Sequence, residues 1–283
     1  MAAIYRSAEG QAAVEALYRQ ALQRWPVPYR HVVVPTCEGD TSVVASGDPH
    51  APPLVLLHGS GTNATSWIRD VAPLAQRFCV YAIDMIGETG PSAPSRPPLA
   101  SDRYAAWLDD VWRELGIASA HVAGVSLGAW LALDLAVRRP EKAASLVLIS
   151  PSGIGRTNHL TMLRLALLRM CGTRGLRRSF AIVAGREMPG PLMGLMTTVF
   201  RHFRPRLERI PIRTDLELAS LRVPLLAILG GRDALLRSAE TRDRLTRLVP
   251  NARVTYLEQE GHILPPQAGA IAEFAGALPL LLA

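Results

Sequence analysis

The sequence predicts a single α/β fold built on a mostly parallel, doubly wound central sheet with helices on both faces. Six short apolar runs alternate with segments of helical periodicity after a polar linker at residues 47–53. Uninterrupted apolar runs are typical of strands that are covered on both faces, and the alternation favours parallel pairing. The runs lie at residues 54–57, 80–83, 121–125, 146–149, 225–229 and 253–257.

The N-terminal part of the chain has a different pattern. Residues 8–24 place apolar side chains at helical spacing, and Pro26 and Pro28 end the pattern. Two β-branched segments follow at 31–35 and 41–46, with Glu38, Gly39 and Asp40 between them. This spacing predicts a helical appendage over residues 1–29 that packs on the main domain, followed by an antiparallel hairpin.

The alternation of strands and helices stops between the fourth and fifth apolar runs, from residue 152 to about 215. Such a length greatly exceeds an ordinary connection, so we expect an inserted helical lid or cap. Within it, residues 159–171 and 192–203 have helical patterns, separated by a break rich in Gly and Pro. The core would then comprise residues 30–151 and 216–283, and the lid residues 152–215.

Composition narrows the classes of protein to consider. The chain has 283 residues, 49% of them hydrophobic, which is enough for a large core. No apolar run approaches the roughly 18 residues of a membrane-spanning helix, so we expect no transmembrane segment. The three cysteines are scattered without metal-type spacing, and no export signal is visible. We therefore expect a cytoplasmic protein without a metal or cofactor; the sequence does not specify its oligomeric state.

The strongest chemical signal is Gly124-Val125-Ser126-Leu127-Gly128, which follows an apolar strand and opens a helix. Glycines on both sides of the serine permit a sharp turn that raises the hydroxyl above the edge of the sheet. The pattern predicts Ser126 as a nucleophile, the alternative being an ordinary turn between strand and helix.

A serine nucleophile needs a base, and the base needs a carboxylate to orient it. Of the seven histidines, His262 follows the last strand, at the sheet edge where catalytic loops gather. Asp233 follows the preceding strand at the same edge and is our candidate for the carboxylate. The alternative for Asp233 is a helix N-cap.

Catalysis also requires N–H donors for the developing oxyanion. The backbone N–H of Leu127 is the first candidate. The second is expected in His58-Gly59-Ser60-Gly61, directly after the first core strand, where we favour Ser60 with Gly61 as the fallback. His58 is expected to order this loop or, as an alternative, to contact substrate.

With these motifs in place, the chain resembles the α/β-hydrolase superfamily over residues 30–283, in a branch with a lid. The resemblance implies a triad of Ser126, Asp233 and His262. Many relatives carry D-x-x-G-x-G-x-S after the second core strand, whereas residues 84–92 here read DMIGETGPS. Related dehalogenases and epoxide hydrolases carry Asp at the elbow, and Ser126 argues against both.

The apolar side chains of the proposed lid indicate the class of substrate. Its Leu and Met residues, among them Leu163, Leu167, Met193 and Met196, favour a cavity for a small-molecule apolar acyl substrate, the alternative being that they pack on the core. The net charge is +7, and residues 152–215 hold twelve arginines against three acidic residues. This excess allows weak contact with an anionic surface or carrier, or is simply a solvated face. Without interleaved aromatic residues it does not predict nucleic-acid binding.

Three hypotheses follow. The first is a carboxylesterase-like serine hydrolase that cleaves a small or medium apolar ester through an acyl-enzyme. The second keeps the triad but acts on a thioester, a C–C bond or a carrier-linked acyl chain, with an acidic substrate met by the lid arginines. The third is a ligand-binding protein without turnover on a hydrolase scaffold.

Overall fold

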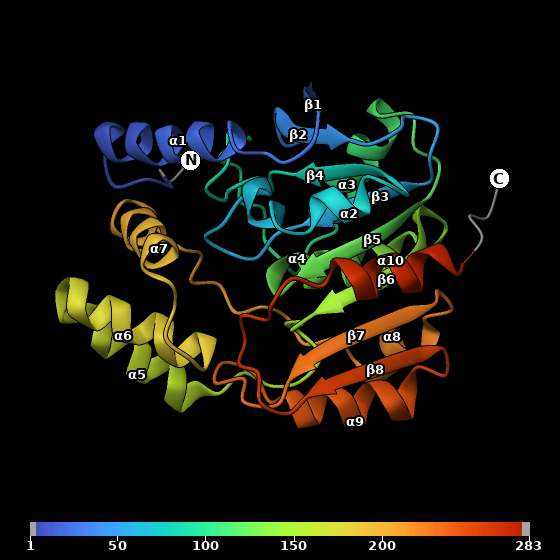
Figure 1. Ribbon diagram of the computed structural model, residues 1–283. Helices are drawn as coiled ribbons and strands as arrows, with labels where there is room; N and C mark the ends of the chain where they lie inside the picture. The colour runs from blue at the N-terminus through green and yellow to red at the C-terminus, as the bar shows by residue number, and fades with distance from the viewer. Residues whose placement is uncertain (1–3, 279–283) are drawn as a thin grey trace.

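The structure is a computed structural model that describes residues 4–278. Residues 1–3 and 279–283, where the expected appendage begins and the expected core ends, lie outside the described residues. Eight strands form one sheet in the order β1-β2-β4-β3-β5-β6-β7-β8 (Figure 1). Their bounds are β1 Tyr29–Val34, β2 Thr41–Ser46, β3 Pro53–Leu57, β4 Cys79–Ile83, β5 Ala120–Val125, β6 Ala143–Ile149, β7 Leu225–Gly230 and β8 Ala252–Leu257.

The pairing of the strands confirms the expected mixed sheet. β1 pairs with β2 and β2 with β4 in antiparallel fashion, which is the predicted leading hairpin and its junction with the core. All pairs from β4 to β8 are parallel. The six apolar runs became β3 to β8, each displaced from its predicted limits by three residues at most. The inner strands are buried and need apolar side chains on both faces, whereas β8, at the edge of the sheet, is only partly buried.

Helices cover both faces of the sheet (Figure 1). One buried cluster joins the sheet to α3, α4, α8 and α9, and contains the fully buried Trp107, Trp112 and Trp130. The other joins it to α2 and α10, with Trp67 and Phe274. These helices span α2 Val71–Leu74, α3 Arg103–Glu114, α4 Leu127–Arg138, α8 Asp215–Ser220, α9 Ser238–Leu248 and α10 Ala268–Gly276, and short 3₁₀ turns lie at Ala64–Trp67 and Pro140–Lys142.

Three helices lie between β6 and β7, in residues 152–215, which we call the insertion: α5 His159–Met170, α6 Gly172–Ala184 and α7 Gly190–His202. The two expected helices correspond to α5 and α7. α6 was not predicted from the sequence. Its glycines are poor helix formers, but Gly175 permits close packing, since a Cβ there would lie 1.8 Å from the carbonyl oxygen of Leu168.

The N-terminal helix α1 (Ala8–Leu22) connects the insertion to the core. Its Val14 packs with Val199 and Phe203 at the end of α7. On the core side, the Tyr18 hydroxyl donates to Asp84 Oδ2 over 2.6 Å. The helix α1 therefore packs on the core as expected, and it also packs on the insertion. Within residues 4–278, no helix is both long and apolar enough to cross a membrane.

Candidate active site

The turn at Ser126 has the sharp backbone that the motif predicted. β5 ends at Val125, Ser126 adopts φ 53° and ψ −106°, and α4 begins at Leu127. A Cβ added to Gly124 would lie 2.5 Å from the backbone carbon of Gly128, and one added to Gly128 would lie 2.3 Å from the carbonyl oxygen of Leu57. A larger residue at Gly124 would displace the start of α4 from the end of β5, and one at Gly128 would push the turn away from β3, so the two glycines allow the close packing around Ser126.

The structure brings Ser126, His262 and Asp233 together. His262 Nε2 lies 3.0 Å from Ser126 Oγ, and His262 Nδ1 lies 2.7 Å from Asp233 Oδ2. The other carboxylate oxygen of Asp233 accepts the backbone N–H groups of Leu235 and Leu236, over 2.7 and 2.9 Å. Asp233 thus orients the imidazole with one oxygen and has its own position fixed through the other.

Close backbone contacts hold the two loops that carry His262 and Asp233. A Cβ on Gly230, the last residue of β7, would lie 2.0 Å from the carbonyl oxygen of Gly261. The Arg232 N–H donates to the carbonyl of Glu260 over 2.8 Å. Because β7 and β8 are parallel neighbours, the loops leave the sheet at the same edge, and these contacts fix their spacing.

The loop after β3 lies beside the turn at Ser126. A Cβ on Gly59 would approach the Cβ of Ser126 to 3.9 Å. The Gly61 N–H donates to Glu88 Oε2 over 2.6 Å, so the fallback donor is already engaged. Leu127 is the first residue of α4, where backbone N–H groups have no partner within the helix. The N–H groups of Ser60 and Leu127 therefore remain the candidate pair.

Glu88 is a residue that the sequence analysis did not select. Its buried carboxylate accepts from the Gly61 N–H and, over 3.3 Å, from the Ser60 hydroxyl. Burial raises the pKa of Glu88 to about 7, while the Gly61 N–H and the charges of Arg96 and Arg206 oppose that rise. The phenols of Tyr5 and Tyr104 also lie within electrostatic range. The only sequence signal was the departure from the usual pattern at residues 84–92.

His58 is fully buried and belongs to the scaffold of this loop. Its Nε2 accepts the Met85 N–H over 2.9 Å, and its Nδ1 lies 2.9 Å from the carbonyl oxygen of Gly59, an arrangement that requires the proton on Nδ1. Burial lowers the pKa of His58 to about 4, although the Gly59 carbonyl opposes this shift. Because both ring nitrogens are occupied, His58 orders the loop and offers no nitrogen to a substrate, contrary to its inclusion among the substrate-binding candidates.

The insertion reaches this site through two helices. The His262 N–H donates to the carbonyl of Val183 in α6 over 3.0 Å. From α7, the ring of Phe200 lies against the loop after β3, since a Cβ on Gly61 would be 2.6 Å from its Cζ. Phe200 was not selected from the sequence, and neither was Ser152, whose Oγ lies 3.4 Å from Ser126 Oγ.

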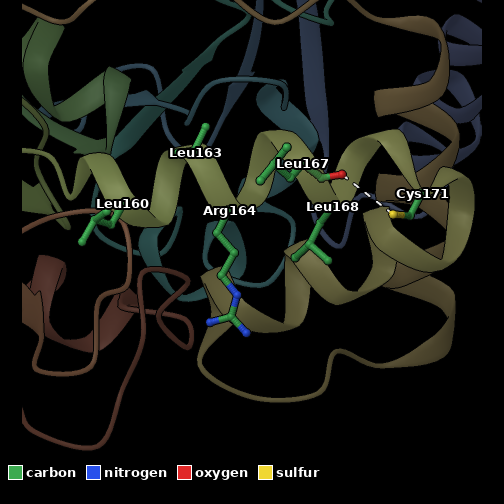
Figure 2. A pocket seen from close by; sticks show the side chains of 6 residues that line it. All are labelled: Leu160, Leu163, Arg164, Leu167, Leu168 and Cys171. Atoms are coloured by element: carbon green, nitrogen blue, oxygen red, sulfur yellow. Dashed lines mark hydrogen bonds between the residues drawn. The ribbon is translucent and has the colours of Figure 1, made fainter.

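The four insertion residues expected to line a substrate cavity separate into two groups. Met193 is buried and Met196 half-buried, and both share a face of α7 with Phe200 at helical spacing. Leu163 and Leu167 are mostly exposed and line a shallow groove on α5 that contains none of the catalytic candidates (Figure 2). The expectation was therefore wrong for these two leucines, because the α5 side chains that turn inward are others, such as Leu165.

Comparison with known proteins agrees with the fold. The model of the alpha/beta hydrolase family matches residues 54–277. Carboxylesterase YbfK of Bacillus subtilis (strain 168) is 30% identical over 256 residues, which cover 87% of this chain and 86% of the relative. The crystal structure of carboxylesterase CesB (YbfK) from Bacillus subtilis has a TM-score of 0.80 at 28% identity, and the match covers 95% of this chain and 94% of that one.

A second crystal structure, of naproxen esterase (carboxylesterase NP) from Bacillus subtilis, has a TM-score of 0.82 at 26% identity and covers 96% of both chains. Among residues 4–278, no cluster of three or more His, Cys, Asp or Glu side chains could hold a metal ion. The family match covers most of the chain, and the sheet order and the turn at Ser126 accord with it. The chain belongs to the alpha/beta hydrolase family.

Proposed function

We propose that the protein is a serine hydrolase that cleaves carboxylic esters of small or medium apolar substrates through an acyl-enzyme on Ser126. The observation that carries this proposal is the continuous contact from Ser126 Oγ to His262 Nε2 and from His262 Nδ1 to Asp233 Oδ2, over 3.0 and 2.7 Å. Both distances allow hydrogen bonds, as a nucleophile, its base and the orienting carboxylate require. The similarity to proteins named carboxylesterases supports the choice of an ester as substrate.

In the proposed mechanism, Ser126 Oγ attacks the ester carbonyl carbon while His262 Nε2 takes the hydroxyl proton. The carbonyl oxygen becomes an oxyanion that accepts the N–H groups of Leu127 and Ser60. His262 then donates its proton to the leaving alcohol, which leaves an acyl group on Ser126. Water, deprotonated by His262, releases the acid, and Asp233 stabilises the imidazolium in both steps.

The insertion supports an apolar substrate. The face of α7 that carries Phe200, Met193 and Met196 is apolar, and Phe200 lies next to the loop that would hold the oxyanion. Phe200 also packs edge-on against Phe180 of α6, with ring centroids 5.0 Å apart. An acyl or alkyl group near Gly61 would contact these side chains, and methionine adapts its shape to irregular ligands.

The proposal is tested with a panel of p-nitrophenyl acyl esters of increasing chain length, together with lactones and thioesters. The wild-type protein should release p-nitrophenol, and Ser126→Ala should lower kcat by about 10⁴-fold or more. Ser152→Ala removes a hydroxyl only 3.4 Å away and should keep most of the activity. Activity that survives in Ser126→Ala, or a wild-type protein that acts on thioesters alone, contradicts the proposal.

A further inference from the structure

An apolar stripe on α5 is left uncovered by the other residues between 4 and 278. Leu160, Leu163, Leu167 and Met170 are 80%, 60%, 57% and 82% exposed. Their spacing of three, four and three residues places them along one face of the helix. Figure 2 shows Leu160, Leu163 and Leu167 along the helix, where they line the shallow groove together with Arg164. Contiguous apolar surface of this kind marks a site that another surface covers.

α5 and α6 form a helical hairpin, which carries an unbalanced positive charge. Residues 159–184, which comprise α5, α6 and Cys171 between them, contain five arginines and no acidic residue. Arg169 places its guanidinium over the ring of Phe200, 5.4 Å from the ring centroid. The other four, Arg164, Arg174, Arg177 and Arg178, are exposed, and none forms a salt bridge within residues 4–278. The stripe therefore lies on a hairpin whose charge is uncompensated.

We propose that this outer face of the α5–α6 hairpin docks on an anionic lipid surface. The two features together suit such a surface: the leucines and the methionine would enter the boundary of the acyl chains, while Arg164 beside them and the exposed arginines of α6 would meet the lipid phosphates. α5 has 12 residues and is about 18 Å long, so it is too short to span a bilayer and would lie in its plane. A second copy of the chain is disfavoured as occupant, because it would bring the same positive charge to the contact.

The docked hairpin would also contact the candidate active site through the end of α6. α6 ends at Ala184, and the Val183 carbonyl accepts the His262 N–H over 3.0 Å. If the proposed ester hydrolysis is correct, an apolar ester dissolved in the lipid would meet the protein on the insertion, next to the helices that reach Ser126. The docking itself does not depend on that function, because it is measured as binding and not as turnover.

The test measures binding of the wild-type protein to vesicles of phosphatidylcholine alone and of phosphatidylcholine with phosphatidylglycerol, by co-sedimentation. We expect binding to the anionic vesicles only, and weaker binding as salt is raised. Replacing Arg174, Arg177 and Arg178 with Gln should weaken binding about 100-fold, since each arginine near an anionic surface contributes about fivefold. Removing the same number of charges elsewhere, at Arg6, Arg24 and Arg30, should change it far less.

The apolar part is tested with Leu163→Ser/Leu167→Ser, which should weaken binding at least about tenfold. The matched control is Leu207→Ser/Leu216→Ser, which removes two leucines that are even more exposed but lie off α5. If the first variant loses its thermal unfolding transition, Leu160→Ser/Met170→Ser tests the same stripe.

Three results would overturn the inference: no binding to the anionic vesicles, equal binding to vesicles of phosphatidylcholine alone, or equal losses in the matched controls. A dimer in analytical ultracentrifugation that becomes a monomer in the stripe variant, without vesicle binding, would identify a second copy as the occupant instead.

Discussion

Ser126 occupies a backbone conformation that few residues other than glycine adopt. Its φ of 53° is held by the neighbouring packing of Gly124 and Gly128 against the backbone of β3 and α4. The cost of such a conformation, of the order of 1–3 kcal/mol, is offset by the surrounding fold. This conformation directs the Ser126 hydroxyl toward His262. It also places the hydroxyl at the start of α4, where the first backbone N–H groups have no partner within the helix.

Asp233→Asn tests the orienting carboxylate. The amide has the same shape but would present its NH₂ group or a neutral oxygen to His262 Nδ1, and thus loses the charge that stabilises the imidazolium. We expect kcat on p-nitrophenyl acetate to fall about 10⁴-fold, with the melting temperature nearly unchanged. Asp243→Asn, an exposed acid on α9, is the control. Comparable activity in the two variants would contradict the proposed role.

Glu88 is expected to position the loop after β3, which carries Ser60 and Gly61. Glu88→Ala removes the acceptor of the Gly61 N–H, and we expect kcat to fall between about 10-fold and 10²-fold while KM changes little, because the displaced loop matters most in the transition state. Glu88→Gln keeps an oxygen acceptor and should recover most of this loss. Steady-state kinetics on one ester provide the measurement; an equal loss in both variants would point to the charge rather than to loop position.

The raised pKa of Glu88 also predicts a pH dependence of stability. Burial raises this pKa from 4.5 to about 7. Between these values the folded protein keeps a proton that the unfolded chain releases, so a contribution fully present below pH 4.5 is lost as the pH rises through about 7. The loss is at most about 1.4 kcal/mol per pH unit.

Glu88→Gln cannot titrate, so its free energy of unfolding relative to wild type should increase from pH 4.5 to 7. Asp84, whose pKa burial raises to about 6, is present in both proteins and largely cancels. Urea denaturation at several pH values measures the difference. A difference that stays constant across this range would show that Glu88 does not carry the shifted proton.

At the scale of elements, secondary structure was predicted best where the apolar pattern in the sequence matches the burial of the element in the fold. The strands β3, β6 and β7 were identified because both of their faces are covered, which leaves an uninterrupted apolar run, whereas the edge strand β8 alternates half-buried and exposed residues. α6 was missed because Gly172 and Gly175 lower its helix propensity. Gly175 is required by the close approach to α5, and Gly172 adopts a φ of 63°, which favours glycine. The exposure of Leu163 and Leu167 was also missed, because the periodicity of apolar residues does not tell which face of α5 is covered.

The contact between α1 and α7 predicts a large effect from a single core residue. Phe203 is fully buried between Tyr5, Val14 and Val199, its ring edge-on to Tyr5 at 6.1 Å. Phe203→Ala should lower the free energy of unfolding by about 3–5 kcal/mol, because it opens a cavity between the two helices. Leu207→Ala, at an exposed position nearby in the chain, should have almost no effect in the same urea titration. Equal effects would mean that this cluster adds little to stability.

For the whole molecule, the parallel sheet explains why residues distant in the sequence converge. Ser126 follows β5, Asp233 follows β7 and His262 follows β8, so each leaves the sheet at the same edge. Their grouping could be predicted because the order of motifs and strands defines that edge. Glu88, Ser152 and Phe200 could not be predicted, because they reach the site through loops and an insertion whose path depends on packing and not on local pattern.

The central claim is that Ser126 is acylated during turnover, and intact-protein mass spectrometry tests it most directly. After a brief reaction with a slowly hydrolysed p-nitrophenyl ester, we expect one acyl group per chain, located on the peptide that contains Ser126, and no adduct in Ser126→Ala or His262→Ala. An acyl group on another residue, or the same adduct in Ser126→Ala, would contradict the account.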